Sequence, residues 1–395
     1  MCVVDAIGAD NDFGGIGVDP PRLRGGAAFR QPFFEGVERH AVGHVPALTG
    51  RIPPGAERLG AVLVGIWDIE KLHGLWNVKI NRVILAALFA CAASPGQAQE
   101  QPRAQSQAGV PQGDSFTLQL APAAAPAAEE GSVQFIGTAT VLIRFQGFTI
   151  LTDPNFLHKG DHVHLGYGLK SKRLTDPAIA FENLPPIDLV VLSHLHGDHF
   201  DQLVQEKLAR ATPIVTTKEG GEGLKRMGFT RVYGLSLWDR VEVRRGDARL
   251  RVTATPGRHG PAGVAALLPR VMGSVLDFGP DPQAPRYRMY ISGDTLVYED
   301  IHAIPKYFPG IDLALLHLGG TRILGVVKVT MDGKDGVRMM QLVRAKKTAP
   351  IHYNDYDVFK SPLEEFAREV QAAGLEKDVI YLKHGETYQF APARP

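Results

Sequence analysis

Three histidines and two aspartates lie within eight positions of this chain, in the run SHLHGDHFD that ends at residue 201. The preceding residues, IDLVVLS, predict a strand that is buried on both faces. His194 and His196 are two positions apart, so an extended chain points both side chains to one side. The glycine that follows allows a turn, which presents Asp198 and His199. Two imidazoles facing one cation, with a carboxylate and an imidazole facing a second, predict a metal-binding motif.

The same run could instead be a polar turn between a strand and a helix, with histidines that bond to neighbouring groups. Such a turn needs one or two polar side chains, whereas four candidate ligands occur here within six positions. We therefore favour metal binding.

Three more candidate ligands follow predicted strands: His259 in TATPGRHG, Asp294 in YISGDT and His352 in APIHYND. Taken singly, each could be a bonded histidine or a turn-forming aspartate. Taken together with the motif, they make five histidines and two aspartates at strand ends, where α/β proteins place their ligands.

Composition limits the classes of partner and fold. The 395 residues carry a net charge of +1 without a basic excess, which argues against nucleic acid as a partner. The two cysteines, Cys2 and Cys91, exclude a disulfide scaffold. Short apolar or alternating runs with helical segments between them predict an α/β fold with mixed sheets.

The first 98 residues contain no folded domain in this interpretation. Residues 1–77 lack any sustained period and are read as an artefactual or disordered extension, with translation starting near Val78. Residues 78–98 have a basic start, an eleven-residue apolar core and a small-residue end, which is typical of a signal peptide cleaved after Ala98. The apolar run is too short to span a bilayer. We expect a periplasmic or secreted protein; an uncleaved anchor and a lipoprotein processed at Cys91 are the alternatives.

Residues 99–130 are rich in glutamine, alanine and proline and predict a low-complexity linker. The folded domain is expected over 131–393. Cleavage after Ala98 would leave no cysteine, so a metal site would use nitrogen and oxygen ligands.

At these motifs the sequence resembles the metallo-β-lactamase superfamily, over nearly all of residues 132–390. The runs FIGTATVLIRFQGFTILTDPNF, YISGDT and PIHYND are most similar to its ascorbate-6-phosphate lactonase-like and N-acylphosphatidylethanolamine phospholipase D-like branch. The resemblance implies a four-layer αββα sandwich with two metal ions. It also implies the ligands, which are His194, His196 and His259 for one ion, Asp198, His199 and His352 for the other, and Asp294 as the bridge.

Two positions depart from many relatives, which carry histidine where Thr138 stands and proline where His317 stands. Neither position binds metal in the family, so the departures bear on substrate preference. The bridging residue is aspartate and not cysteine, which argues against an antibiotic-resistance role.

The expected function is an exported dinuclear hydrolase, in which a metal-bound hydroxide attacks an ester, lactone or phosphodiester. Asp198 would also accept a hydrogen bond from the attacking water. The ligand set suits Zn²⁺, with Mn²⁺ or Fe²⁺ as alternatives. The substrate would be a small molecule or a lipid. A mononuclear iron dioxygenase and a non-catalytic metal-binding module remain as alternatives.

Four further residues are candidates for supporting roles. Asp153 and Asp201 could orient ligand imidazoles, or serve only as turn and cap residues. Arg173, together with the histidine-rich loop before it, could select the substrate. Tyr353 could donate to an oxyanion or simply be a packed aromatic ring.

Overall fold

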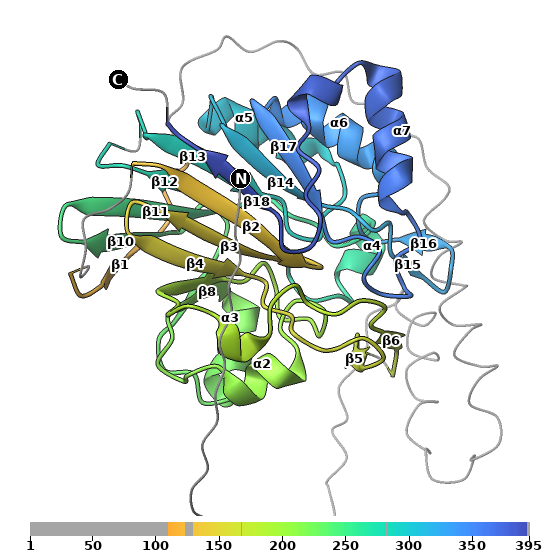
Figure 1. Ribbon diagram of the computed structural model, residues 1–395, viewed down its shortest axis with the longest axis horizontal. Coiled ribbons are helices and arrows are strands. Elements are labelled where there is room, and N and C mark those ends of the chain that lie inside the picture. The colour runs from red at the N-terminus through yellow and green to blue at the C-terminus, as the bar shows by residue number, and fades with distance from the viewer. Residues whose placement is uncertain (1–109, 123–128, 167, 282, 393–395) are drawn as a thin grey trace, which may run out of the picture. The chain divides into compact units, whose positions relative to one another are not determined.

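The computed structural model describes residues 110–122, 129–166, 168–281 and 283–392. The predictions for residues 1–77 and 78–98, and for the first part of the linker, lie outside the described residues. Two seven-stranded sheets lie face to face, and helices cover the outer face of each (Figure 1).

The first sheet has the order β18-β2-β3-β4-β7-β8-β9. Its strands are β2 (Gly131–Gly137), β3 (Thr140–Phe145), β4 (Phe148–Thr152), β7 (Leu189–Val191), β8 (Ile214–Thr217), β9 (Val232–Leu235) and β18 (Thr387–Phe390). Helices α2 (Gln202–Lys207) and α3 (Lys218–Arg226) pack on its outer face. A short 3-10 helix, Phe181–Asn183, precedes β7.

The second sheet has the order β1-β10-β11-β12-β13-β14-β17. Its strands are β1 (Ser115–Gln119), β10 (Arg240–Arg245), β11 (Ala248–Thr255), β12 (Gly273–Phe278), β13 (Tyr287–Ile291), β14 (Leu313–His317) and β17 (Lys347–Ile351). Its outer face is covered by α5 (Ala303–Tyr307), α6 (Gly333–Val343) and α7 (Leu363–Ala373). Two 3-10 helices, Glu299–His302 and Glu376–Asp378, flank these elements.

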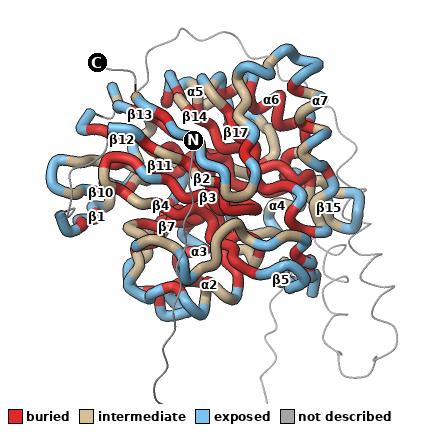
Figure 2. The backbone as a smooth tube through the Cα atoms, viewed as in Figure 1, coloured by how far each residue is buried: buried red, intermediate tan, exposed pale blue. Residues whose placement is uncertain are grey.

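The apolar core follows this layering. The largest cluster of buried side chains lies between the sheets and includes Phe135, Val252 and Met289. Two other clusters join each sheet to its helices, around Phe366 on one side and Phe200 on the other. Figure 2 shows the buried residues concentrated in the central strands. The predicted four-layer αββα sandwich is therefore confirmed.

One boundary prediction is wrong. Strand β1, Ser115–Gln119, falls inside the predicted linker yet pairs in parallel with β10. Leu118 is buried, and Phe116 packs against the same core. The run SFTLQL alternates apolar and polar residues, as a strand at a sheet edge requires, and this period-2 signal was outweighed by the surrounding alanine- and proline-rich composition.

Smaller elements gather beyond the strand ends. They are the hairpin of β5 (His162–His164) and β6 (Lys170–Lys172), the short helix α4 (Ala262–Ala265), and the hairpin of β15 (Arg322–Ile323) and β16 (Val327–Lys328). Figure 1 shows all of them at one edge of the two sheets. Among the described residues no helix has the length and apolarity to cross a membrane.

Candidate metal centre

Four strands deliver the candidate ligands to one edge of the sandwich. The motif follows β7, while His259, Asp294 and His352 follow β11, β13 and β17. In the second sheet β13 runs parallel to β14 and β14 parallel to β17, and two antiparallel pairings give β11 the direction of β13. The carboxyl ends of these strands therefore meet at a shared edge, which explains why His194 and His352, 158 positions apart, converge.

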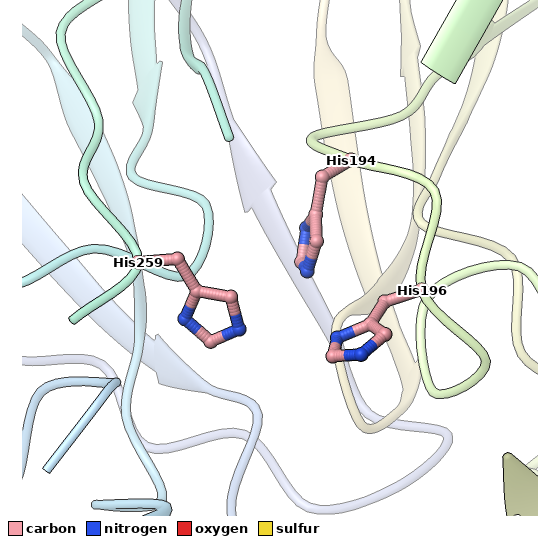
Figure 3. A group of neighbouring side chains, drawn as sticks. All are labelled: His194, His196 and His259. Carbon is pink, nitrogen blue, oxygen red and sulfur yellow. The ribbon is translucent and has the colours of Figure 1, made fainter. Parts of the chain in front are cut away.

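The first group consists of His194, His196 and His259, whose candidate ligand atoms lie within 4.8 Å of one another. Figure 3 shows the three rings around a common space. One nitrogen of each ring is already engaged. His196 Nε2 donates to the carbonyl oxygen of Leu165 at 2.9 Å, and His259 Nδ1 donates to that of Val329 at 2.9 Å. Because a carbonyl only accepts, these bonds leave the other nitrogen of each neutral ring with a free lone pair.

The second group consists of Asp198, His199, Asp294 and His352, all buried and again within 4.8 Å. His352 Nδ1 donates to the carbonyl oxygen of Leu318 at 3.1 Å, and its Nε2 lies 3.4 Å from Asp198 Oδ2. His199 Nε2 lies 3.3 Å from Asp294 Oδ2. The same carboxylate oxygen is 3.9 Å from His259 Nε2, so Asp294 stands between the two groups.

Several buried atoms in this cluster have no hydrogen-bond partner. They are His194 Nε2, His199 Nε2, His352 Nε2, Asp198 Oδ1 and Asp294 Oδ1. A buried polar atom left unpaired costs about 1–3 kcal/mol. Five such atoms facing one another are therefore unfavourable unless a cation binds there, and a set of imidazoles and carboxylates suits Zn²⁺, Mn²⁺ or Fe²⁺. The residues fit a metal centre.

Burial and the carboxylates of Asp198 and Asp294 shift the pKa values of the ligand histidines in opposite directions. Burial lowers the pKa of His194 well below its usual value and that of His259 to about 4. Burial also opposes protonation of His199 and His352, but Asp294 and Asp198 outweigh it and raise both pKa values. His194 and His259 thus present neutral rings, whereas the raised pKa values of His199 and His352 favour protons that a metal ion would displace.

Asp153 supports the second group from behind. It accepts hydrogen bonds from the Ser193 backbone N–H at 2.7 Å and from the Ser193 hydroxyl at 2.9 Å. Its carboxylate also lies 3.5 Å from His199 Nδ1 and 3.2 Å from His317 Nε2. Although burial opposes its ionisation, these two histidines lower the Asp153 pKa to about 2. A carboxylate in this position orients the His199 ring so that Nε2 faces the centre.

Replacing Asp153 with alanine is expected to weaken metal binding by roughly 10- to 100-fold, because His199 loses its orienting partner. Competition against a chromophoric chelator measures this affinity. Asp247→Ala, at an exposed turn, is the control and should bind metal like the parent protein. Unchanged affinity in Asp153→Ala would show that His199 is held by other contacts.

The other predicted supporting residues lie elsewhere. Asp201 caps α2 by accepting from the Val204 backbone N–H and also accepts from Leu157, so it shapes the chain around the motif without touching a candidate ligand. Tyr353 is a packed ring whose hydroxyl donates to the Leu382 carbonyl. Its proposed oxyanion role is not supported by this placement.

Arg173 was predicted to select the substrate, and the structure contradicts this. Its side chain is fully buried, bonded to Asn155 and the Thr175 carbonyl, with the guanidinium 5.2 Å from the centre of the Tyr356 ring. It therefore fixes the loop from inside. The sequence offered only a cationic side chain in a glycine-rich stretch, which does not distinguish a surface residue from a buried one.

Sequence reasoning missed two members of the centre. The Ser193 hydroxyl oxygen lies 3.0 Å from His194 Nδ1. The His317 ring stacks on the His199 ring, with the ring centroids 5.8 Å apart. The sequence does single out His317, because it is a histidine at the end of a predicted strand where many relatives carry proline. The carbonyls of Leu165, Leu318 and Val329 have no such signal, because any residue supplies a carbonyl.

Comparison with known proteins identifies the class that this fold and site define. Residues 149–353 match the family model of the β-lactamase superfamily domain. The chain therefore belongs to this superfamily, as the sequence motifs predicted.

Similar proteins indicate the kind of enzyme within this superfamily. A UPF0173 metal-dependent hydrolase of Symbiobacterium thermophilum is 30% identical over 210 residues, which are 52% of this chain and 83% of the relative. One from Hyperthermus butylicus is 27% identical over 66% of this chain and 100% of the relative. These relatives confirm the predicted enzyme class, a metal-dependent hydrolase of the superfamily.

Two solved structures agree on the fold. An isothiocyanate hydrolase from Delia radicum gut bacteria has a TM-score of 0.56 and 21% identity, covering 66% of this chain and 100% of its own. A possible metal-dependent hydrolase from Veillonella parvula has a TM-score of 0.56 and 21% identity, covering 65% and 98%.

Proposed function

We propose that this protein is a dinuclear metal-dependent hydrolase that cleaves an ester, lactone or phosphodiester. The observation that carries the proposal is the set of unpaired, buried ligand atoms in two adjoining groups, with Asp294 within reach of both. The first ion would be held by His194, His196 and His259, and the second by Asp198, His199 and His352, with Asp294 shared. When bound, such ions would lower the pKa of water and polarise the substrate's carbonyl or phosphoryl oxygen.

The chain's own groups orient the ligand histidines and supply a hydrogen-bond acceptor for the attacking water. Three ligand histidines donate to the backbone carbonyls of Leu165, Val329 and Leu318, and these bonds fix their tautomers. Asp198 Oδ1 accepts no hydrogen bond among the described residues, so it is available to accept one from the attacking water. Zn²⁺ is the proposed metal, and the lactonase-like and phospholipase D-like branch is the proposed place within the superfamily.

Turnover of bis-p-nitrophenyl phosphate, p-nitrophenyl acetate and a simple lactone by the zinc-loaded protein tests this function. We expect hydrolysis of at least one of them, with about two metal ions per chain by elemental analysis. His196→Ala should reduce turnover by at least about a hundredfold, because it removes a ligand and not only an orienting partner. His302→Ala, an exposed histidine on a 3-10 helix, is the control.

Other outcomes of the same experiment point to other functions. One iron ion per chain with no hydrolysis would favour an oxidation. Full loading with two ions and no turnover of any substrate class would favour a metal-binding module.

We also propose that the protein is exported. The support is the basic, apolar and small-residue pattern of residues 78–98 and the absence of cysteine from residue 92 onward. N-terminal sequencing of protein recovered from the periplasm or medium should begin at Gln99. A mature chain that still contains MCVVDAIG would contradict both the cleavage and the proposed start near Val78.

A further inference from the structure

Large apolar side chains are exposed on three loops around the metal centre. Of the exposed large hydrophobic residues in the described chain, Leu169 lies at the β5–β6 hairpin, Leu267 follows α4, and Leu324 and Val326 lie at the β15–β16 hairpin. Val326 and Leu267 are 65% and 61% exposed. Single exposed leucines are ordinary, but a group of them on neighbouring loops marks an interaction surface.

Two of these loops also contact ligand histidines through backbone carbonyls. The β5–β6 hairpin contains Leu165, whose carbonyl accepts from His196, and Val329 just after β16 accepts from His259. A cleft of about 440 Å³ separates the β5–β6 hairpin from the segment after α4, and His196 forms part of its lining. Two of the three apolar loops, the β5–β6 hairpin and the segment after α4, therefore line an opening that leads to His196.

The β15–β16 turn is built at a conformational cost. Leu324 and Gly325 both have positive φ angles, 50° and 73°. The connection between the strands has three residues, 324–326, and the Val326 backbone N–H donates to the Ile323 carbonyl at 3.1 Å. A positive φ angle is uncommon for leucine, because its side chain crowds the backbone there. Leu324 is 50% exposed in this conformation, so the domain buries only about half of its side chain.

Cationic residues flank each apolar tip. Lys170 and Lys172 follow Leu169, Arg270 follows Leu267, and Arg322 precedes the β15–β16 turn. All four are exposed. Exposed leucine and valine side chains with lysine or arginine close to them in the chain are typical of surfaces that lie in the interface of an anionic bilayer. A protein partner would need to match three separate tips, whereas a bilayer accepts all of them at once.

We infer that the loops around the metal centre form a docking surface for an anionic lipid bilayer. The surface is defined by Leu169, Leu267, Leu324 and Val326 with the four flanking cations. It would lie flat on the bilayer with its tips in the headgroup region, and the cleft beside His196 would open toward the lipid. This inference is independent of the proposed reaction.

Sedimentation of the metal-loaded full chain with sucrose-loaded vesicles tests it. We compare phosphatidylcholine vesicles with vesicles of phosphatidylcholine and phosphatidylglycerol in a 3:1 ratio. Binding is expected on the mixed vesicles and should weaken as salt rises, because each flanking cation contributes electrostatically. Leu324→Ser with Val326→Ser should weaken this binding by roughly tenfold or more, because two apolar side chains lose their burial. The matched control is Leu237→Ser, a 49% exposed leucine between β9 and β10.

Thermal unfolding of each variant checks that the fold is intact. Equal binding by the Leu324→Ser, Val326→Ser variant and the Leu237→Ser control would overturn the inference. So would failure of the parent protein to bind the mixed vesicles at low salt. A dimer that dissociates when the tips are changed, measured by light scattering, would assign the surface to a second copy and also overturn it.

Discussion

Asp294→Asn is expected to lower metal content below two ions per chain and to reduce turnover by at least about a hundredfold. The asparagine keeps the size of the side chain but removes the charge that both groups share. Asp294 Oδ2 lies 3.3 Å from His199 Nε2 and 3.9 Å from His259 Nε2, so this one carboxylate is within reach of both groups. Elemental analysis and turnover of the best substrate found for the parent protein measure the two effects.

The control is Asp300→Asn, an exposed aspartate six residues further along the chain. It carries the same chemical change away from the centre and should leave both metal content and turnover unaltered. Two bound ions and full activity in Asp294→Asn would refute the bridging role, whereas loss of one ion with activity retained would place the reaction on a single ion.

The candidate ligands could be predicted from the sequence for two reasons, one local and one topological. Four of them share one short run, and the other three each follow an apolar strand whose carboxyl end is a preferred position for ligands in α/β proteins. The convergence itself required only that the strands be parallel at one edge, which the layered fold supplies.

What surrounds the ligands was much less predictable. The partners of His196 and His259 are carbonyls from Leu165 and Val329, which lie 31 and 70 positions away in the chain. Strand β1 was not predicted, because its alternation of apolar and polar residues is short and the flanking sequence is of low complexity. The burial of Arg173 depends on Asn155 and Tyr356, which come from distant segments. Tertiary contacts set all of these features.

The metal-free protein is expected to be most stable near pH 6.5, the ordinary pKa of histidine. Below this pH the unfolded chain binds more protons than the native chain, because burial lowers the pKa values of His194, His259 and His317. Stability should therefore fall as the pH drops, by up to about 1.4 kcal/mol per pH unit for each such proton.

Above pH 6.5 the sign reverses. Asp294 and Asp198 raise the pKa values of His199 and His352, so the native chain keeps protons that the unfolded chain has released. Their stabilising ion pairs are fully present below pH 6.5 and are lost as the pH rises through the native pKa values. Urea unfolding of protein treated with chelator, from pH 5 to 9, should give a maximum with two falling limbs.

Metal binding should change the alkaline limb of the stability curve, and a variant of His199 tests the cause of that limb. Binding requires neutral imidazoles, so it displaces the protons on His199 and His352, and the stabilisation by a fixed zinc concentration should grow as the pH rises. In His199→Asn the alkaline limb of the metal-free protein should become shallower, whereas His158→Asn, at an exposed position, should leave the curve unchanged. Stability of the metal-free protein that rises steadily from pH 6.5 to 9 would mean that these two histidines are neutral in the native chain, and that the carboxylates interact with a group other than the imidazoles.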